Sequence, residues 1–497
     1  MTLAKNQVLK IEQYLSSSQY CQAEVLLRKI LCKMENCSTY LPYLYQTLFS
    51  LGKYYDLINE IHQSLPHLSD QNEGLFYLYK SHIAIGQYEG AIVAIDKISS
   101  IVSETLPFLM DKAICYYHLS DLDSAERIIH EIALLQPDSA AVHNNLGNIQ
   151  KDRGRINTAL ASFKRSIQLS PCMVDAYIGA GVTSLMKGDR IEGERYFISA
   201  INIDSRNYLA QSHLAHFYYK EKAFDKAEKL WIQLSNQYPA HTGSYLSLSN
   251  LYQKTGRPEQ AIEILDRCLL IDPNCGTVAH INSALKQETT DTAPASYIKE
   301  LFDGYADSFE KHLTQELNYQ TPEQLFALWQ KHNNKPSNLG KTLDLGCGTG
   351  LSARPFYIYT TYLTGIDLSE GMVEIARDKG IYNELIISDI YPYLANNQSK
   401  FDTCLAIDVL NYSGNLYNLF PKIHSSLEPH GLFLFSTEAS ETADYTLQKN
   451  GRYQHSKTYI DKLLKTTGFR IIAAHTAEIR KEKDQWVEGD LYITQKI

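Results

Sequence analysis

The chain has 497 residues, of which 44% are apolar and 21% are charged, a composition typical of soluble globular proteins rather than disordered or collagen-like chains. No apolar run reaches the ~18–20 residues that a membrane-spanning helix needs, and the first residues lack the apolar segment of a signal peptide. The net charge of −9 provides no general attraction for nucleic acid. We therefore expect a cytoplasmic protein that binds neither a membrane nor nucleic acid.

Cysteine usage and length narrow the class further. The nine cysteines are scattered and form no Cys-x-x-Cys pair, so we expect reduced thiols and no metal site. The length alone indicates about three domains of ~150 residues. The 35 tyrosines are unusually many and call for an explanation.

A 34-residue period runs from about residue 4 to residue 275, in eight units without an insertion. A column of mostly small residues reads Ala23, Leu57, Ala91, Ala125, Ala159, Gly193, Ala227 and Ala261. A column of large apolar residues, four positions later, reads Leu27, Ile61, Ile95, Ile129, Phe163, Phe197, Trp231 and Leu265. The column between the two helices of each unit reads Ser18, Gly52, Gly86, Ser120, Gly154, Gly188, Lys222 and Gly256.

This pattern predicts pairs of packed helices. A small residue lets one helix approach another, a large residue one turn on fills the gap, and glycine supplies the turn. The repeats resemble the tetratricopeptide repeat family, which implies an all-α solenoid over residues 1–289, capped by a helix near 276–287. The unit at 38–69 departs most from the family, because Leu57 occupies its small column.

Solenoids of this kind usually bind a peptide or a protein partner on their concave face. The resemblance implies several groove-facing residues, and one pair resembles asparagines that hold peptide backbones. These candidates are Asp111, Asn145, Asn148, His213, His216 and Asn250. The alternative is that they are solvated polar residues on helix faces. Whether the groove serves an intramolecular contact or a partner stays open.

The 34-residue period ends before a short polar segment that contains Pro294. We interpret residues 290–300 as a linker and place the second domain at 301–497. Strands alternate with helices there, so two domains replace the three that length alone indicates.

The second domain begins with an apolar strand at 341–345 that leads into a glycine-rich turn, Asp344-Leu345-Gly346-Cys347-Gly348-Thr349-Gly350. Glycines let a backbone come close to a ligand, and a following helix N-terminus has free N–H groups. Three further predicted strands end in acids, Asp367, Asp389 and Asp408. Asp367 follows Gly346 by 21 residues, the spacing at which an acid meets a ribose diol. Acids at the carboxyl ends of parallel strands face the ligand crevice.

A dinucleotide is the alternative ligand, but the loop reads Gly-x-Gly-x-Gly after an acid, and Asp344 would repel a pyrophosphate. The domain resembles class I S-adenosylmethionine-dependent methyltransferases, an α/β Rossmann-like fold. The resemblance implies that the loop holds the methionine part of S-adenosylmethionine, that the acids meet the ribose, the adenine and the reacting methyl group, and that the strand order is 3-2-1-4-5-7-6 with the seventh antiparallel. The implied cofactor set is Asp344, Gly346, Cys347, Gly348, Gly350, Asp367, Leu368, Asp389, Ile390 and Asp408.

Segments on both sides of this core, around residues 301–313 and 451–456, make the whole chain similar to bacterial predicted methyltransferases that carry N-terminal tetratricopeptide repeats. Tyr305, Phe309 and His312 share one helix face, which either packs on the sheet or closes over the ligand; we expect packing for Phe309 and a lid role for Tyr305. His455 is either a general base or holds its loop.

The remaining predicted catalytic residues are Asp408, Arg452 and Tyr453. Arg452 either meets an acceptor carboxylate bidentately or braces Glu438 or Asp408. Tyr453, with Tyr305 and Tyr412, is expected to shape the pocket.

The sequence thus predicts methyl transfer to an oxygen or nitrogen of a small molecule or a protein, with the repeats recruiting a partner. The Asn/Asp-Pro-Pro-aromatic motif of enzymes that methylate amides and exocyclic amines does not follow the fourth strand, where the chain reads Asp408-Val409-Leu410-Asn411-Tyr412. The alternative is a repeat scaffold whose methyltransferase-like half binds the cofactor without turnover.

Overall fold

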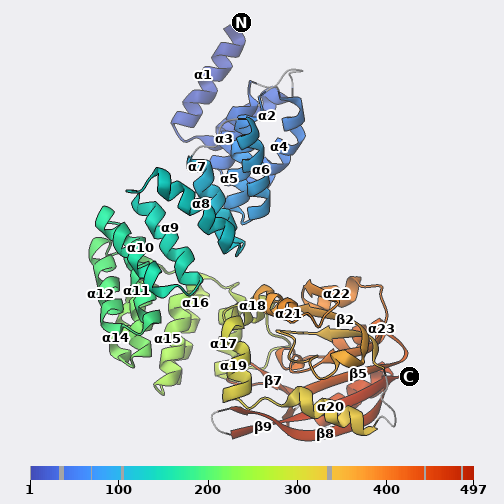
Figure 1. Cartoon of the computed structure of the whole chain (residues 1–497). Coiled ribbons are helices and arrows are strands. Elements are labelled where there is room, and N and C mark those ends of the chain that lie inside the picture. Colours follow the sequence, from blue (N-terminus) through green and yellow to red (C-terminus); the bar gives the residue numbers. More distant parts are fainter. Residues whose placement is uncertain are drawn as a thin grey trace. The chain divides into compact units, whose positions relative to one another are not determined.

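The computed structural model describes residues 2–32, 39–68, 70–101, 106–332, 338–441, 444–482 and 485–497 (Figure 1). The chain divides into two compact units, Met1–Leu230 and Trp231–Ile497. The first unit is built from helices, and the second contains further helices and a mixed sheet. The predicted boundary near residue 290 stays a prediction.

The helices come in pairs, and a short turn joins the two helices of each pair. They are α1 (Thr2–Ser16), α2 (Tyr20–Leu31), α3 (Leu41–Ser50), α4 (Tyr54–Ser64), α5 (Asn72–Ala84), α6 (Tyr88–Ile101), α7 (Leu106–His118), α8 (Leu122–Leu135), α9 (Ala140–Asp152), α10 (Ile156–Leu169), α11 (Val174–Lys187), α12 (Arg190–Ile203), α13 (Tyr208–Lys220) and α14 (Phe224–Gln237), with a short 3₁₀ turn η1 (Leu65–His67) after α4. The second unit continues with α15 (Thr242–Lys254), α16 (Pro258–Ile271) and α17 (Gly276–Lys286).

The predicted columns lie at the buried positions of these helices. All members of the small and large columns are buried, including Leu57 in the unit that departs from the pattern. The Phe163 ring fills the space above two glycines of neighbouring helices, where an added Cβ would come within 2.7 Å at Gly147 and 2.4 Å at Gly179. Every residue of the turn column has a positive φ, the non-glycines Ser18, Ser120 and Lys222 included. The repeat prediction is confirmed at the level of these helix pairs.

Several predicted groove residues contact neighbouring side chains in the first unit. Asp111 accepts hydrogen bonds from Lys80 Nζ at 2.8 Å and from the Tyr79 hydroxyl at 3.2 Å. The Asn145 amide donates to the Met110 sulfur at 3.1 Å. These contacts link successive helix pairs, and a role in peptide binding stays a prediction.

The α/β part of the second unit adds shorter helices around a sheet (Figure 1). The helices are α18 (Ala295–Asp303), α19 (Ala306–Lys311), α20 (Thr321–His332), α21 (Glu370–Asp378), α22 (Ile390–Asn396), α23 (Leu419–Ser426) and α24 (Lys457–Thr467), with short turns η2 (His312–Glu316), η3 (Tyr357–Tyr359) and η4 (Leu410–Tyr412). The strands are β1 (Gly340–Leu345), β2 (Thr360–Asp367), β3 (Glu384–Ile387), β4 (Phe401–Ala406), β5 (Leu427–Ser440), β6 (Tyr445–Leu447), β7 (Tyr453–Ser456), β8 (Phe469–Glu482) and β9 (Gln485–Lys496).

The strand order confirms the expected topology. Strands β3, β2, β1, β4 and β5 are parallel neighbours, and β9 pairs antiparallel with both β5 and β8. The core order is therefore 3-2-1-4-5-9-8, the predicted 3-2-1-4-5-7-6 in other numbers. The sequence did not indicate β6 and β7, a small hairpin whose second strand pairs in parallel with the last residues of β5.

Alternation along the strands divides the core into two layers, because successive side chains point to opposite faces. On one face, Leu325 and Trp329 of α20 pack against strand residues such as Leu405 and Leu434. On the other face, α23 and α24 cover Cys404, Ala406 and the rings of β5. Both faces are covered, as a parallel sheet requires.

The segment predicted as a linker, residues 290–300, lies along the sheet domain and contains most of α18. Asp291 accepts hydrogen bonds at its backbone oxygen from the amides of Gly414 (2.9 Å) and Asn415 (2.7 Å). The Ala293 amide donates to the Tyr412 carbonyl at 3.0 Å. Since its backbone groups pair with the loop after β4, this segment is part of the second unit's packing.

No helix in the described ranges is long and apolar enough to cross a membrane. The cysteines within the described residues are all free; Cys37 lies outside them.

Candidate active site

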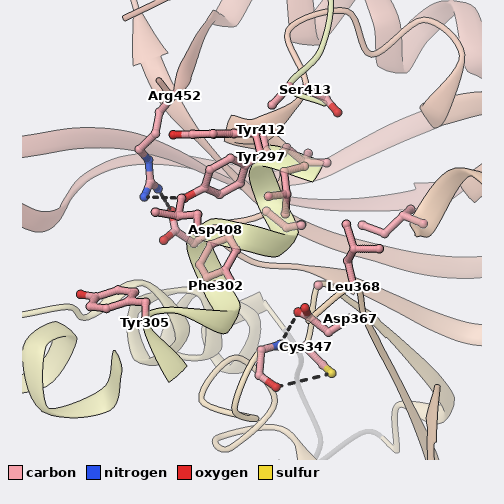
Figure 2. A pocket seen from close by; sticks show the side chains of 18 of the residues that line it. Tyr297, Phe302, Tyr305, Cys347, Asp367, Leu368, Asp408, Tyr412, Ser413 and Arg452 are labelled. Atoms are coloured by element: carbon pink, nitrogen blue, oxygen red, sulfur yellow. Dashed lines mark hydrogen bonds and ion pairs between the residues drawn. The ribbon is translucent and has the colours of Figure 1, made fainter. Parts of the chain in front are cut away.

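A cavity of about 820 Å³ opens at the carboxyl ends of β1 to β4. Its floor comes from the loops that follow these strands, and its opposite wall comes from α18, α19 and the residues on either side of them. Figure 2 shows Asp367 and Cys347 on one side of the cavity and Arg452, Asp408 and the aromatic rings on another.

The glycine loop after β1 forms one end of the cavity. Gly346, Cys347 and Gly348 line it. Gly346 has a φ of 65°, and an added Cβ would come within 2.3 Å of Val409, so only glycine fits here. The Gly348 amide donates to Asp367 Oδ2 at 2.8 Å. The loop is thereby tied to the end of β2.

Two predicted members of the cofactor set lie elsewhere. Asp344 is buried beneath the loop, where its Oδ2 accepts hydrogen bonds from Ser352 (2.8 Å) and Tyr382 (2.7 Å). Burial raises its pKa to about 7, although these hydrogen bonds oppose the shift. Neither Asp344 nor Gly350 lines the cavity. Asp344 lies beneath the loop, and contact of either residue with the cofactor stays a prediction.

The three strand-end acids meet at this one cavity, as predicted. Asp367, Asp389 and Asp408 all line it, together with Leu368 and Ile390. Asp367 accepts hydrogen bonds from the amides of Gly348 and Ser369 (2.9 Å) and is partly buried, and burial raises its pKa. Asp389 caps α22 through the Tyr391 amide at 2.8 Å.

Asp408 has a φ of 57°, an uncommon conformation for a residue other than glycine. Its Oδ1 accepts hydrogen bonds from Arg452 Nη2 at 2.6 Å and from Asn411 Nδ2 at 2.8 Å. Such conformations cluster at functional sites, where the surroundings hold the strain.

Arg452 belongs to a buried network of two arginines and two acids. Its Nε donates to Glu438 Oε1 at 2.5 Å, and Arg480 Nη2 donates to the same oxygen at 2.7 Å. Glu438 and Arg480 are only 2% and 3% exposed. Burial opposes the charge on Glu438, but the two guanidiniums hold its pKa below the ordinary value. Of the alternatives for Arg452, the structure shows the brace, to Asp408 and Glu438 at once.

Aromatic side chains form the wall opposite the glycine loop. Tyr305 stands directly before α19, its hydroxyl is hydrogen-bonded to His312 Nδ1, and its ring meets Phe309 at 5.3 Å. Phe302 meets Tyr412 edge-on at 5.4 Å. All five line the cavity, so Phe309, expected only to pack on the sheet, also faces the ligand space.

His455 and Tyr453 lie outside the cavity lining. His455 Nε2 is hydrogen-bonded to the carbonyl oxygens of Ser413 (2.9 Å) and Gly414 (3.1 Å). Its burial lowers its pKa to about 4. The Tyr453 hydroxyl pairs with Thr290 at 2.6 Å. These contacts favour the second alternative for His455, which holds its loop, and place Tyr453 against residues 290–294. A catalytic role for either residue stays a prediction.

Sequence reasoning missed Tyr297 and Arg480. Tyr297 lies in the predicted linker, whose composition indicated no packing, yet it lines the cavity and is buried. Arg480 lies on a buried face of β8. No signal in the sequence indicated it, because Glu478, Lys481 and Glu482 surround it and its ion-pair partners are distant in the chain. Within the described residues, no cluster of His, Cys, Asp and Glu could hold a metal ion.

Comparison with known proteins gives matches to both parts of the chain. A family model described as a methyltransferase domain matches residues 343–435, and one described as a tetratricopeptide repeat matches residues 140–171 and 242–275. The methyltransferase match covers the glycine loop and all three strand-end acids. The repeat matches coincide with two of the predicted 34-residue units.

Among curated relatives, the malonyl-[acyl-carrier protein] O-methyltransferase of Serratia marcescens is 26% identical over 24% of this chain and 44% of its own length. The cellulose synthase 1 operon protein C of Komagataeibacter xylinus is 26% identical over 35% of this chain and 14% of its own length. The chain therefore spans less than half the length of each.

Among solved structures, magnesium protoporphyrin IX methyltransferase from Synechocystis, with bound SAH, is 18% identical, with a TM-score of 0.33 over 41% of this chain and 99% of that chain. The strand order, the site and the family matches lead to the same assignment: the chain carries tetratricopeptide repeats followed by a class I methyltransferase domain.

Proposed function

We propose that the chain is an S-adenosylmethionine-dependent methyltransferase that methylates an oxygen or nitrogen of its acceptor. The observation that carries this is the meeting of the glycine loop with Asp367, Asp389 and Asp408 around one cavity. The cavity volume of about 820 Å³ suits a nucleoside-sized ligand and leaves room beside it, since ligand pockets typically measure ~300–1,000 Å³.

The lining residues fit S-adenosylmethionine. All of the following line the cavity: Gly346 and Gly348 would let the backbone approach the methionine end, Asp367 would accept from the ribose hydroxyls, and Asp389 with Ile390 would meet the adenine edge. Asp408 then stands beside the reacting methyl group. When bound, S-adenosylmethionine supplies an activated methyl group, so the protein mainly aligns the partners and excludes water. The aromatic wall of α18 and α19 would perform that exclusion.

The first test is a calorimetric titration of the full chain with S-adenosylmethionine. We expect saturable binding, and Asp367→Ala should weaken it by about 1–3 kcal/mol, the scale of a lost charged hydrogen bond. Asp378→Ala removes an exposed acid at the end of α21 and serves as the matched control. Absence of binding by folded protein would refute the proposal, and unchanged affinity in Asp367→Ala would refute the ribose assignment.

We also propose that the repeats recruit a protein partner or the acceptor itself, on the strength of the family match and the usual role of such solenoids. Radiolabelled methyl transfer into a lysate of the host organism distinguishes the two. Label in protein would mean that the repeats recruit a substrate, and label in small molecules would make them a docking platform for a partner. Cofactor binding without any transfer would instead favour a scaffold.

A further inference from the structure

The part of the cavity away from the glycine loop is formed by aromatic rings and by one ion-paired network. The rings belong to residues of α18, α19, the segment after η2, and η4. They are Tyr297, Phe302, Tyr305, Phe309, Tyr319 and Tyr412. This side is left for the acceptor if the glycine loop and strand-end acids hold the cofactor, so the inference rests on the proposed function.

The charges on this side cancel. Arg452 is the one lysine or arginine among the described residues that line the cavity. Its Nη2 contacts Asp408 at 2.6 Å and its Nε contacts Glu438 at 2.5 Å, while Arg480 stands 2.7 Å from Glu438. Two cations therefore face two acids, and the Arg452 guanidinium lies 5.4 Å from the Tyr412 ring. The described residues that line this side therefore offer an anionic group no cation without an acidic partner.

Asp408 keeps one oxygen for a ligand. Its contacts with Arg452, Asn411 and Arg480 all end on Oδ1. Among the described residues, none hydrogen-bonds to Oδ2, and the side chain lines the cavity beside the aromatic wall (Figure 2). A carboxylate oxygen can only accept, so a ligand group placed here must donate a hydrogen.

We propose that the acceptor is an amine on an apolar body, which donates to Asp408 Oδ2 and packs its body among the rings. An acceptor with a carboxylate or phosphate would lose its hydration beside the negative charge of Asp408, and Arg452 is already paired with that acid. Binding of such an anion is therefore strongly disfavoured. An amine that binds in its charged ammonium form is in addition attracted electrostatically to the faces of the aromatic rings. An alcohol would require a base, and the histidine of the described lining, His312, is already hydrogen-bonded to Tyr305.

The methyl transfer needs no co-substrate other than S-adenosylmethionine. An amine that binds as an ammonium first loses one proton to solvent, which frees the lone pair. The lone pair of the amine nitrogen attacks the methyl carbon of the co-substrate S-adenosylmethionine, the C–S bond breaks, and its electron pair stays on sulfur. The methylated nitrogen then carries a positive charge that its hydrogen bond to the Asp408 carboxylate stabilises, and the product leaves as an ammonium or releases its proton to solvent. The products are the methylated amine and S-adenosylhomocysteine.

The test uses three size-matched probes: phenethylamine, phenethyl alcohol and phenylacetate. Each is titrated calorimetrically into the full-length chain saturated with S-adenosylhomocysteine. We expect phenethylamine to bind about 10-fold or more tightly than phenylacetate, the effect of one charge-assisted hydrogen bond. Mass spectrometry with S-adenosylmethionine should then find N-methylphenethylamine.

Asp408→Asn sharpens the test, because it removes one acid and leaves Arg452 partly unpaired. We expect this variant to lose the amine preference and gain phenylacetate binding, while Asp378→Asn, which is exposed and outside the lining, behaves as wild type. If Asp408→Asn fails to fold, the relative affinities of the wild-type protein for the three probes still test the proposal.

Equal or tighter binding of phenylacetate, preference for the alcohol, or binding of no probe to protein that binds S-adenosylmethionine would overturn the inference. Failure of S-adenosylmethionine itself to bind would overturn the proposed function instead.

Discussion

The aspartates around the glycine loop occupy different environments although they are the same residue type. Asp367 and Asp408 line the cavity, while Asp344, from the same glycine-loop region, is hydrogen-bonded beneath it. The sequence placed Asp344 at the head of the glycine loop and predicted Asp367 and Asp408 at the carboxyl ends of strands. It could not show that Ser352 and Tyr382 cover Asp344, because Ser352 lies in turns at 351–356, where a helix was expected, and Tyr382 lies in the segment between α21 and β3.

Burial of His455 predicts a pH-dependent stability. Its pKa is about 4 in the folded chain, against ~6.5 for an ordinary histidine. Between these values the unfolded chain binds the extra proton, so the free energy of unfolding falls as pH drops through this window. From about pH 7.5 to about pH 5 the expected loss is about 2 kcal/mol.

The measurement compares thermal and urea unfolding of wild type and His455→Gln at both pH values. The glutamine amide can still donate to a carbonyl but does not titrate, so the variant should lose less stability on acidification. An identical pH dependence in the two proteins would contradict the assignment. Cofactor affinity should be nearly unchanged in the variant, because His455 lies outside the cavity lining.

At the scale of elements, residues in the left-handed conformation form the turns between the repeat helices and the turn between β6 and β7. The 34-residue column predicted all eight repeat turns, and even Lys222 adopts the left-handed conformation there. The loop between β6 and β7 follows another logic: Gly451 has a φ of 82°, and its carbonyl accepts a hydrogen bond from His280 of α17 at 2.9 Å. The periodic turns were predictable because they repeat, and the single turn at Gly451 was not.

Gly451→Ala should be clearly more destabilising than Gly380→Ala. Both glycines are left-handed, which alone costs an alanine about 1–2 kcal/mol, but nothing lies within 4 Å of a Cβ at Gly380. At Gly451 the Cβ would come within 2.5 Å of the Tyr297 hydroxyl, adding about 1–3 kcal/mol of overpacking. Thermal unfolding of the two variants tests this. An equal loss of stability in both would show that the Tyr297 side chain moves aside at little cost.

At the scale of the whole molecule, the residues that form the site all belong to one compact unit, Trp231–Ile497. That unit includes α15 to α17 and the segment 289–294, whose Ala293 and neighbour Tyr297 pack with Tyr412 and Tyr453. The methyltransferase core matched by similarity, residues 343–435, is thus smaller than the part of the chain that builds the cavity.

A fragment of residues 231–497 should bind S-adenosylmethionine nearly as the full chain does. A fragment of residues 301–497 lacks Tyr297 and Ala293, and we expect it to be less stable by about 2–5 kcal/mol, the scale of removing large buried side chains. Calorimetry gives the affinities and circular dichroism the unfolding midpoints. Equal stability and affinity of the shorter fragment would show that residues before 301 are dispensable for the site.

The sequence by itself determined the local and periodic features. The helix pairs follow from a column pattern repeated every 34 residues, and the glycine loop with its strand-end acids follows from short-range spacing, because strand ends and turns are set by neighbouring residues. Part of the tyrosine excess follows too, since Tyr45, Tyr79 and Tyr245 are buried between repeat helices.

Only the tertiary structure decided which polar residues reach the cavity. Arg452, Glu438, Arg480 and Asp408 come together from four separate segments, and His455 is excluded by carbonyls 41 and 42 residues away in the chain. Burial and charge pairing arise from contacts between distant segments, and these contacts exist only once the sheet has formed.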